Sequence, residues 1–319
     1  MEYAEDSMLP KHVKSLLEKQ QYRIVGRHSA VKVCYWTRQK LIHGRACYKE
    51  LWYKNVQSHR CMQMTPFLGC NYRCTYCWRV HSGDRPEYVW QEYPAQLSEL
   101  DDSAHILEEA VRLRRSLLIG YKANPLVDQK VFEEALEPSM VTFSLTGEPT
   151  LYPRLGELVG EARRRSIVTY LVTNGSMPEV LEDLNPLPDQ LYISLQGSNE
   201  EVFKKVARPL VKDAWQRLVT SLELLSSLNG VRRVLRITVV KNVNDSDAEG
   251  YAKLMSIANP DYVEVKAYEW VGESQSRLPK NAMPWMSDIV TLSEKISSAS
   301  GYVKKGEFEP SGVVLLSRS

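Results

Sequence analysis

Cysteine is absent from most of this chain: all six cysteines lie at or before Cys77, within a sequence of 319 residues. The sequence also has no uninterrupted apolar stretch of about 18 residues, which excludes a membrane-spanning helix. The first residues, Met1–Asp6, are acidic and lead into no apolar segment, so a secretory signal is not expected. We therefore expect a cytoplasmic protein with no membrane partner, whose reduced thiols are available to bind metal.

An excess of charge of either sign is missing as well. Forty-one Lys and Arg residues face 39 Asp and Glu residues, and the formal net charge is +2. Overall charge therefore neither requires nor excludes a nucleic-acid partner, and local clusters must decide. Apolar residues make up 43% of the chain, which suffices for a full hydrophobic core in one large domain or two smaller ones.

Short apolar runs alternate with helical patterns from residue 63 onwards. The runs are almost continuously apolar, which is typical of parallel strands covered on both faces. Helical periodicity marks residues 103–118, with Ser103 as the expected N-cap, and residues 214–228. The alternation predicts an α/β fold, either a parallel barrel or an open sheet, with active residues at the carboxyl ends of the strands. The expected strands are Gln63–Gly69, Val141–Leu145, Ile167–Thr173, Gln190–Leu195, Val234–Val240 and Tyr262–Ala267, and Gly312–Leu316 is expected to pair with the barrel edge or with the N-terminal extension.

Three cysteines, Cys70, Cys74 and Cys77, are spaced as C-x3-C-x2-C. This spacing suits three thiolates that hold one [4Fe–4S] cluster and leave its fourth iron open. A zinc site with His81 as a fourth ligand is the alternative, although structural zinc sites usually use paired C-x2-C motifs. The motif directly follows the first predicted strand, and this position favours the cluster.

A cluster loop after the first strand resembles the radical S-adenosylmethionine superfamily. The resemblance implies a partial parallel (β/α)6 barrel and cleavage of the cofactor to a 5′-deoxyadenosyl radical. It also implies that Thr146, Gly147 and Glu148 hold the methionine ammonium group, because glycine permits close backbone approach and a carboxylate suits a cation. The remaining cofactor-binding residues expected at the following strand ends are Thr173, Asn174, Ser194 and Gln196.

The other three cysteines, Cys34, Cys47 and Cys61, stand at near-even intervals upstream. Buried structural cysteines are the alternative interpretation, since free cysteine is among the most buried residue types. With Lys49 two places after Cys47, the pattern resembles that of the archaeal 4-demethylwyosine synthases. The resemblance implies that these cysteines hold an auxiliary [4Fe–4S] cluster in an extension formed by residues 1–62. Residues 63–319 would then form the barrel and its C-terminal elements.

In that family the substrates are pyruvate and N1-methylguanosine at position 37 of phenylalanine tRNA, and the product is the tricyclic base 4-demethylwyosine. The resemblance implies that the auxiliary cluster chelates pyruvate and that Lys49 is catalytic, condensing with the pyruvate ketone as a Schiff base. A neutral amine is needed for that step, and a desolvated or cationic surrounding favours it. The alternative for Lys49 is a solvated surface lysine.

The modified base lies in the anticodon loop, where a single-stranded base can be splayed out and stacked on aromatic side chains. Basic residues near the strand ends are expected to contact RNA phosphates: Lys122, Lys204, Lys205 and Arg277. A charged run on a helix, by contrast, is typical of a solvated face, and we expect this of Arg163–Arg165. An external electron donor and a monomeric enzyme are also expected.

Two rival functions remain open at this point. One is another two-cluster radical enzyme with a peptide or metabolite substrate, and the other is a non-catalytic, zinc-stabilised RNA-binding protein. A weaker possibility keeps the cluster at Cys70, Cys74 and Cys77 and makes the upstream cysteines structural.

Overall fold

The computed structural model describes residues 8–94 and 99–318, and its chain divides into two compact units. The first unit contains the described residues up to Cys70, together with Trp90–Leu171 and Leu184–Asp189. The second contains Asn71–Val89, Val172–Asp183 and the described residues from Gln190 onwards. The chain therefore leaves the first unit directly after the first cysteine of the C-x3-C-x2-C motif.

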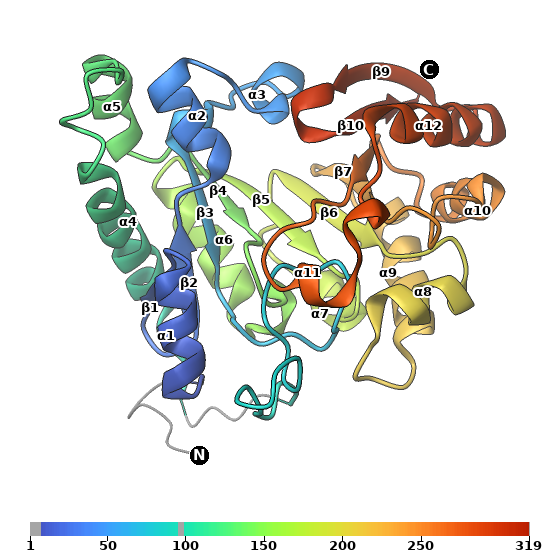
Figure 1. Ribbon diagram of the computed structural model, residues 1–319, viewed down its shortest axis with the longest axis horizontal. Coiled ribbons are helices and arrows are strands. Elements are labelled where there is room, and N and C mark those ends of the chain that lie inside the picture. The colour runs from blue at the N-terminus through green and yellow to red at the C-terminus, as the bar shows by residue number, and fades with distance from the viewer. Residues whose placement is uncertain (1–7, 95–98, 319) are drawn as a thin grey trace. The chain divides into compact units, whose positions relative to one another are not determined.

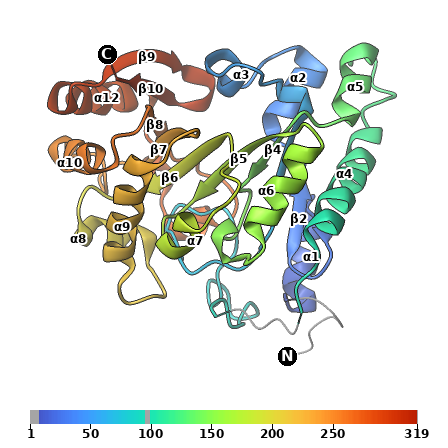
Figure 2. The same ribbon diagram turned by 180° about the vertical axis from the view of Figure 1, so that it is seen from behind.

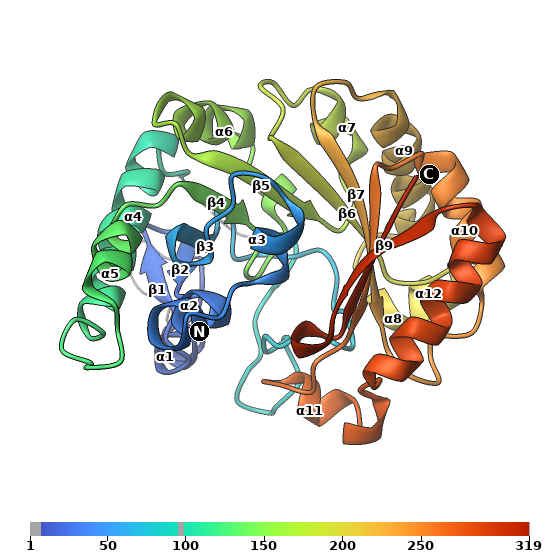
Figure 3. The ribbon, with the colours of Figure 1, turned by 90° about the horizontal axis from the view of Figure 1, so that it is seen from above.

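The first unit is a mixed sheet covered by helices. Its strands are β1 (Arg23–Val25), β2 (Ser29–Lys32), β3 (Cys61–Thr65), β4 (Met140–Phe143) and β5 (Val168–Thr173), whose last two residues belong to the second unit. Strands β1, β2 and β3 pair antiparallel, whereas β3, β4 and β5 pair parallel. Its helices are α1 (Lys11–Lys19), α2 (Tyr35–His43), α3 (Tyr48–Trp52), α4 (Ser103–Ile119), α5 (Gln129–Leu136) and α6 (Leu155–Arg164), with the short turns η1 (Ser58–Arg60) and η2 (Pro149–Leu151). Helices α4 and α6 lie together on the outer face of these strands (Figures 1 and 3).

The second unit continues the alternation of strands and helices. Strands β6 (Gln190–Leu195), β7 (Arg232–Val239) and β8 (Tyr262–Ala267) are parallel, and β10 (Val313–Ser317) pairs antiparallel with both β8 and β9 (Val303–Phe308). Its helices are α7 (Pro178–Glu182), α8 (Glu200–Ala207), α9 (Ala214–Ser227), α10 (Ala248–Ala258), α11 (Ser274–Arg277) and α12 (Met286–Ser300), with η3 (Lys280–Ala282) and η4 (Glu309–Ser311). Helix α10 packs between α9 and α12, as Figure 2 shows from behind.

The predicted strands all form, with small differences at their ends. Strand β3 begins at Cys61 and ends at Thr65, earlier than expected, because Pro66 cannot donate to a neighbouring strand. The N-cap of α4 is Asp102 rather than Ser103: the Asp102 carboxylate accepts from the backbone N–H groups of Ala104 and His105. The predicted strand at Gly312–Leu316 corresponds to β10 and pairs with β8, at the barrel edge.

Among residues 8–94 and 99–318, no helix is both long enough and apolar enough to span a membrane.

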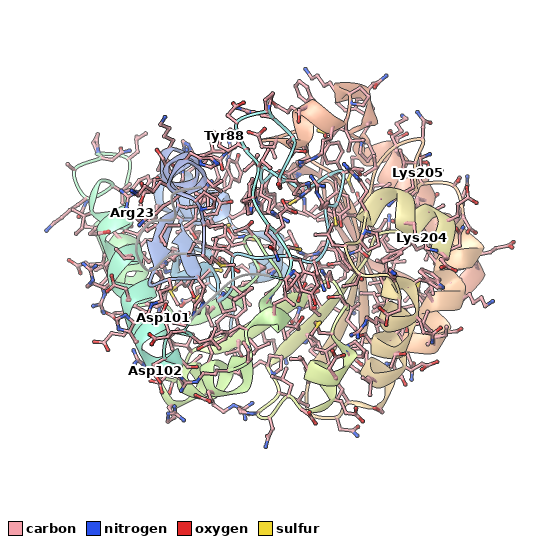
Figure 4. All side chains as sticks on the ribbon, turned by 90° about the horizontal axis from the view of Figure 1, so that it is seen from below. Arg23, Tyr88, Asp101, Asp102, Lys204 and Lys205 are labelled. Carbon is pink, nitrogen blue, oxygen red and sulfur yellow. The ribbon has the colours of Figure 1, made fainter. Side chains whose placement is uncertain are left out.

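A buried histidine joins three segments of the first unit. His28 is fully buried, and its Nδ1 lies 2.7 Å from the carbonyl oxygen of Pro66. The backbone N–H of Asp101, a residue labelled in Figure 4, donates to His28 Nε2 over 3.0 Å just before α4 begins. The carbonyl can only accept and the N–H can only donate, so the ring is neutral, with its proton on Nδ1. Burial lowers the pKa of His28 below its usual value and outweighs the opposite effect of Pro66.

Acidification should therefore weaken the fold through His28. A lowered pKa means that the unfolded chain binds more protons near pH 6.5, so stability is present above about that pH and is lost below it. We expect the difference in melting temperature between wild type and His28→Gln to be larger at about pH 8 than at about pH 5.5. Thermal unfolding at both pH values checks this, and an equal difference at both would contradict the assignment.

Candidate functional site

The three upstream cysteines lie in the first unit at the beginnings of three elements. Cys34 precedes α2, Cys47 precedes α3, and Cys61 is the first residue of β3. The first turn of a helix leaves backbone N–H groups unpaired. Neither Cys34 nor Cys47 makes a side-chain capping hydrogen bond, but the nearby backbone N–H groups of Trp36 and Thr37 lower the pKa of Cys34, and that of Lys49 lowers the pKa of Cys47. Such donors favour the thiolate form, which is the form that binds metal.

Burial and the closeness of the other thiols disfavour the thiolate form of Cys34 and Cys47. Burial raises the pKa of Cys34 to about 11, and the neighbouring Cys61 adds to the effect. Burial likewise raises the pKa of Cys47 to about 12, with further contributions from Cys34 and Cys61. Half-buried thiols that repel each other as thiolates suit a shared cation, and its binding would release their protons. Within the described residues, no three His, Cys, Asp or Glu side chains are already arranged to hold a metal ion.

Lys49 lies beside these cysteines. Its charge lowers the pKa of both Cys34 and Cys47, which places its ammonium group among the thiols. The Nζ atom lies 5.0 Å from the centre of the Tyr170 ring, and the Tyr53 ring meets that ring in a T-shaped arrangement with 6.3 Å between the two ring centres. Tyr170 belongs to β5 and is buried, so the lysine side chain is directed at the parallel strands of this unit.

A hydrogen-bond network fixes the short helix that carries Lys49. Glu50 accepts from Lys40 Nζ at 2.8 Å and from the backbone N–H of Ser58 at 2.7 Å. The hydroxyl of Ser58 in turn accepts from the N–H of Cys47, and its carbonyl accepts from the Thr37 hydroxyl. These bonds tie the start of α3 to α2 and to η1, so the positions of Cys47 and Lys49 are coupled.

The turn after β4 lies against the start of the C-x3-C-x2-C loop within the first unit. The N–H of Glu148 donates to the carbonyl of Gly69 over 2.8 Å, directly before Cys70. Gly147 has a φ of +73°, and a Cβ there would lie 2.0 Å from the Phe67 carbonyl oxygen. The carboxylate of Glu148 is buried and accepts from the N–H and hydroxyl of Thr150. The predicted cofactor turn thus contacts the backbone that delivers Cys70.

In the second unit, Asn174 contacts the same loop just past Cys70. Its side-chain amide donates to Asn71 Oδ1 over 3.0 Å, and its own Oδ1 accepts from the N–H of Ser176. Asn71 also donates to the Ser176 hydroxyl over 2.8 Å. Sequence reasoning selected Asn174 but missed Asn71 and Ser176, although Asn71 lies inside the cysteine motif.

Arg277 holds the later part of the cysteine loop. Its side chain is only 7% exposed, and its guanidinium donates to the carbonyls of Thr75, Cys77 and Arg79. The same group pairs with Asp84 and contacts Nδ1 of His81 at 3.1 Å. Burial and the surrounding arginines lower the pKa of His81 far below its usual value, so the imidazole is neutral. Contact of Arg277 with RNA phosphate stays a prediction, because all the bonds described here run inside the protein.

The other predicted cofactor residues lie at the ends of β5 and β6. Gln196 is 1% exposed, and its Oε1 has no hydrogen-bond partner within the described residues. A buried acceptor without a partner is costly, and a bound ligand with a donor group would satisfy it. Ser194 is half-buried on β6, and the hydroxyl of Thr173 accepts from the N–H of Gly175. Thr146 is buried in the turn after β4.

The basic residues predicted to contact RNA differ in their surroundings. Lys204 and Lys205 are exposed on α8, as Figure 4 shows, and Lys204 pairs with Glu200 one turn earlier. Lys122 is exposed in the turn after α4. The expected solvated run Arg163–Arg165 is exposed at the end of α6, as predicted.

Comparison with known proteins defines the class first. The sequence model of the radical SAM superfamily matches residues 64–255, and that of a family described as wyosine base formation matches residues 257–318. A crystal structure of archaeal TYW1 superposes with a TM-score of 0.78 at 28% identity, covering 97% of this chain and 96% of that one. The protein is therefore a radical SAM enzyme, and the predicted α/β fold of the radical SAM type is confirmed, with parallel strands in each of the two units.

Relatives narrow the class. A tRNA 4-demethylwyosine synthase from Pyrococcus horikoshii is 45% identical over 315 residues, which cover 97% of this chain and 90% of the relative. The human protein of that name is 35% identical over 97% of this chain and 41% of its own length. The chain belongs to the family of S-adenosyl-L-methionine-dependent tRNA 4-demethylwyosine synthases. Membership implies S-adenosylmethionine and a [4Fe–4S] cluster as cofactors and a role in the wyosine pathway of tRNA modification.

Replacing Gly147 by alanine should disrupt the junction between the cofactor turn and the cysteine loop. The matched control is Gly44→Ala, since Gly44 also has a positive φ (+67°) but would place its Cβ in open space. The control should lose about 1–2 kcal/mol for its left-handed backbone. Gly147→Ala should lose about 3 kcal/mol more through the clash with the Phe67 carbonyl. Denaturant unfolding measures both, and equal losses would mean that the close approach does not matter.

Proposed function

We propose that this enzyme converts N1-methylguanosine at position 37 of phenylalanine tRNA to 4-demethylwyosine by radical condensation with pyruvate. It would use S-adenosylmethionine and two [4Fe–4S] clusters, the first held by Cys70, Cys74 and Cys77 and the auxiliary one by Cys34, Cys47 and Cys61. Because a carbon–carbon bond of pyruvate breaks, the enzyme would be a carbon–carbon lyase.

The observation that carries this proposal is the position of Lys49. A lysine that only solubilised the surface would extend into water, whereas this one lies among two cysteine thiols and over a buried tyrosine ring. A cation over the face of an aromatic ring is stabilised, and a protonated Schiff base is also a cation. The same site could therefore hold both the free lysine and its adduct with a keto acid.

Solved structures support this role. A structure of TYW1 with a lysine–pyruvate adduct bound superposes with a TM-score of 0.85 at 32% identity and covers 98% of this chain. Membership in the family also disfavours the zinc-stabilised RNA-binding protein and a radical enzyme with an unrelated substrate.

The chain's own residues would act as follows. The amine of Lys49 attacks the ketone carbon of pyruvate and expels water, which forms the Schiff base. Bound S-adenosylmethionine supplies the 5′-deoxyadenosyl radical that removes a hydrogen atom from the N-methyl group. Gly147, Glu148, Asn174 and Gln196 orient that cofactor. The resulting methylene radical adds to C2 of the lysine-bound pyruvate, and cleavage of the C1–C2 bond releases C1 as a one-carbon fragment that carries away the unpaired electron and restores the imine. Attack of the guanine amine on that imine displaces the amine of Lys49, which closes the third ring and frees the lysine.

The partners follow from this chemistry. The anticodon loop of the tRNA would bind near Lys122, Lys204, Lys205 and Arg277, whose positive charges suit phosphate groups. Reduction of the cluster would require an external electron donor, and we propose that the enzyme acts as a monomer in the cytoplasm.

Lys49→Ala tests the proposal. We expect the variant to retain full iron content and to release 5′-deoxyadenosine, yet to make no tricyclic base, because the amine that binds pyruvate is gone. Borohydride reduction should trap labelled pyruvate on the wild type and not on the variant. Mass spectrometry of digested tRNA and of the reduced protein measures both results.

Lys54→Ala is the matched control, since Lys54 is an exposed lysine only a few residues further along. It should behave like the wild type in both assays. Wild-type yield of the tricyclic base from Lys49→Ala would refute the Schiff-base role.

A further inference from the structure

One arginine of the first unit is buried where the helix pattern calls for an apolar residue. Arg114 lies on α4 on the same stripe as the buried Ala110 and Leu118, and it is 1% exposed. Its neighbours Arg112 and Arg115 are 65% and 45% exposed and pair with glutamates. The basic segment of α4 is therefore not a uniform solvated face, because one of its arginines faces the protein interior.

Arg114 binds backbone carbonyls of two segments, helix α5 and the segment that leads into β3. Its Nη2 donates to the carbonyl of His59 over 2.7 Å, its Nε donates to that of Cys61 over 3.3 Å, and its Nη1 donates to that of Ala135. None of the ion pairs found among the described residues involves Arg114; Glu137, the nearby acid, pairs with Arg115 instead. Arg114 thus holds the segment that leads into β3 at the residue where Cys61 begins the strand.

A buried cation without a counter-ion is unfavourable, and hydrogen bonds to neutral carbonyls offset this only in part. An arginine guanidinium is not deprotonated in proteins, so the group is charged at neutral pH. Two groups able to carry a negative charge interact electrostatically with Arg114, the thiol of Cys61 and the carboxylate of Glu137, and Glu137 is exposed and already pairs with Arg115. Three thiolates around a [4Fe–4S] core with two positive charges leave one net negative charge, and reduction adds another.

We propose that Arg114 is the buried counter-cation of the auxiliary cluster and the positioning residue for its ligand Cys61. The proposal rests on the proposed auxiliary cluster at Cys34, Cys47 and Cys61. The guanidinium fixes the backbone of one ligand through its fork of donors, and its charge favours the reduced cluster over the oxidised one. Arg114 touches neither pyruvate nor the cofactor, so its influence reaches the chemistry only through the cluster.

Two substitutions separate the charge from the hydrogen bonds. Arg114→Gln is neutral and retains one amide donor, whereas Arg114→Lys keeps the charge but loses the planar fork. Arg112→Gln is the matched control, an exposed arginine two residues away on the same helix. All are made in a full-length chain in which Cys70, Cys74 and Cys77 are replaced by alanine, so that only the auxiliary cluster is observed. The readouts are the midpoint potential from an EPR-monitored redox titration and the rate of iron loss to a chelator.

Arg114→Gln should shift the potential to more negative values and weaken iron retention by about tenfold or more, as loss of an outer contact does in other metal sites. Arg114→Lys should keep a potential near that of the control while it loses iron faster. If the neutral variant does not fold, Arg114→Lys decides: a control-like potential supports the proposal, and a strongly lowered one overturns it.

Two contrary results have different meanings. A potential unchanged in Arg114→Gln, with the cluster present, would overturn the role of Arg114 alone and leave it a structural residue. Absence of iron from the chain that retains Arg114 would overturn the auxiliary cluster itself, and the role of Arg114 with it.

Discussion

Mutual repulsion of thiolates is the constraint on which the first unit depends. Cys34, Cys47 and Cys61 lie at the start of two helices and one strand, and burial together with the neighbouring thiols raises the pKa of Cys34 and Cys47. Such an arrangement gains little from packing alone, since three small apolar residues would fill the space without that cost. It is explained if a metal cluster shares the three sulfur atoms. Lys49 is held beside these cysteines by the hydrogen bonds of Glu50 and Ser58. It would then lie next to the open iron of that cluster rather than in bulk solvent.

Both cysteine triplets are supported in the same physical way. Each has an arginine from a distant segment that donates to the backbone carbonyls around a cysteine: Arg114 at Cys61 in the first unit, and Arg277 at Cys77 in the second. A guanidinium presents several donors in a fixed plane, so one side chain can fix several backbone carbonyls of the segment that carries a cysteine. In each unit, therefore, an arginine fixes the backbone beside a cysteine through hydrogen bonds to carbonyl oxygens.

The parallel strands could be predicted from sequence because their residues are continuously apolar, and β6 and β8 were predicted to the residue. Strand β9 was missed because its residues are polar and mostly exposed, so only its pairing with β10 defines it. The three-residue strand β1 is too short to give a pattern. The predicted N-cap of α4, Ser103, was wrong by one residue because Asp102 and Ser103 are both good N-cap residues, and Asp102 takes that position.

Residues of the candidate site could be predicted where they belong to a sequence motif. They could not be predicted where their role depends on contacts between distant segments. Spacing selected the six cysteines, and the turn after β4 was found through its glycine and glutamate. Asn71 and Ser176 were missed because their role appears only when segments far apart in sequence meet at Asn174. The burial of Arg114 was missed although the helical period places it in line with Ala110 and Leu118, because an arginine is normally expected to face solvent.

The most direct test of the account counts iron and acid-labile sulfide per chain after anaerobic reconstitution. The comparison is between wild type and a variant with Cys70, Cys74 and Cys77 replaced by alanine. Two clusters predict about eight irons in the wild type and about four in the variant. About four irons falling to none would contradict the auxiliary cluster, and the pyruvate chemistry assigned to Lys49 and the upstream cysteines would have to be withdrawn.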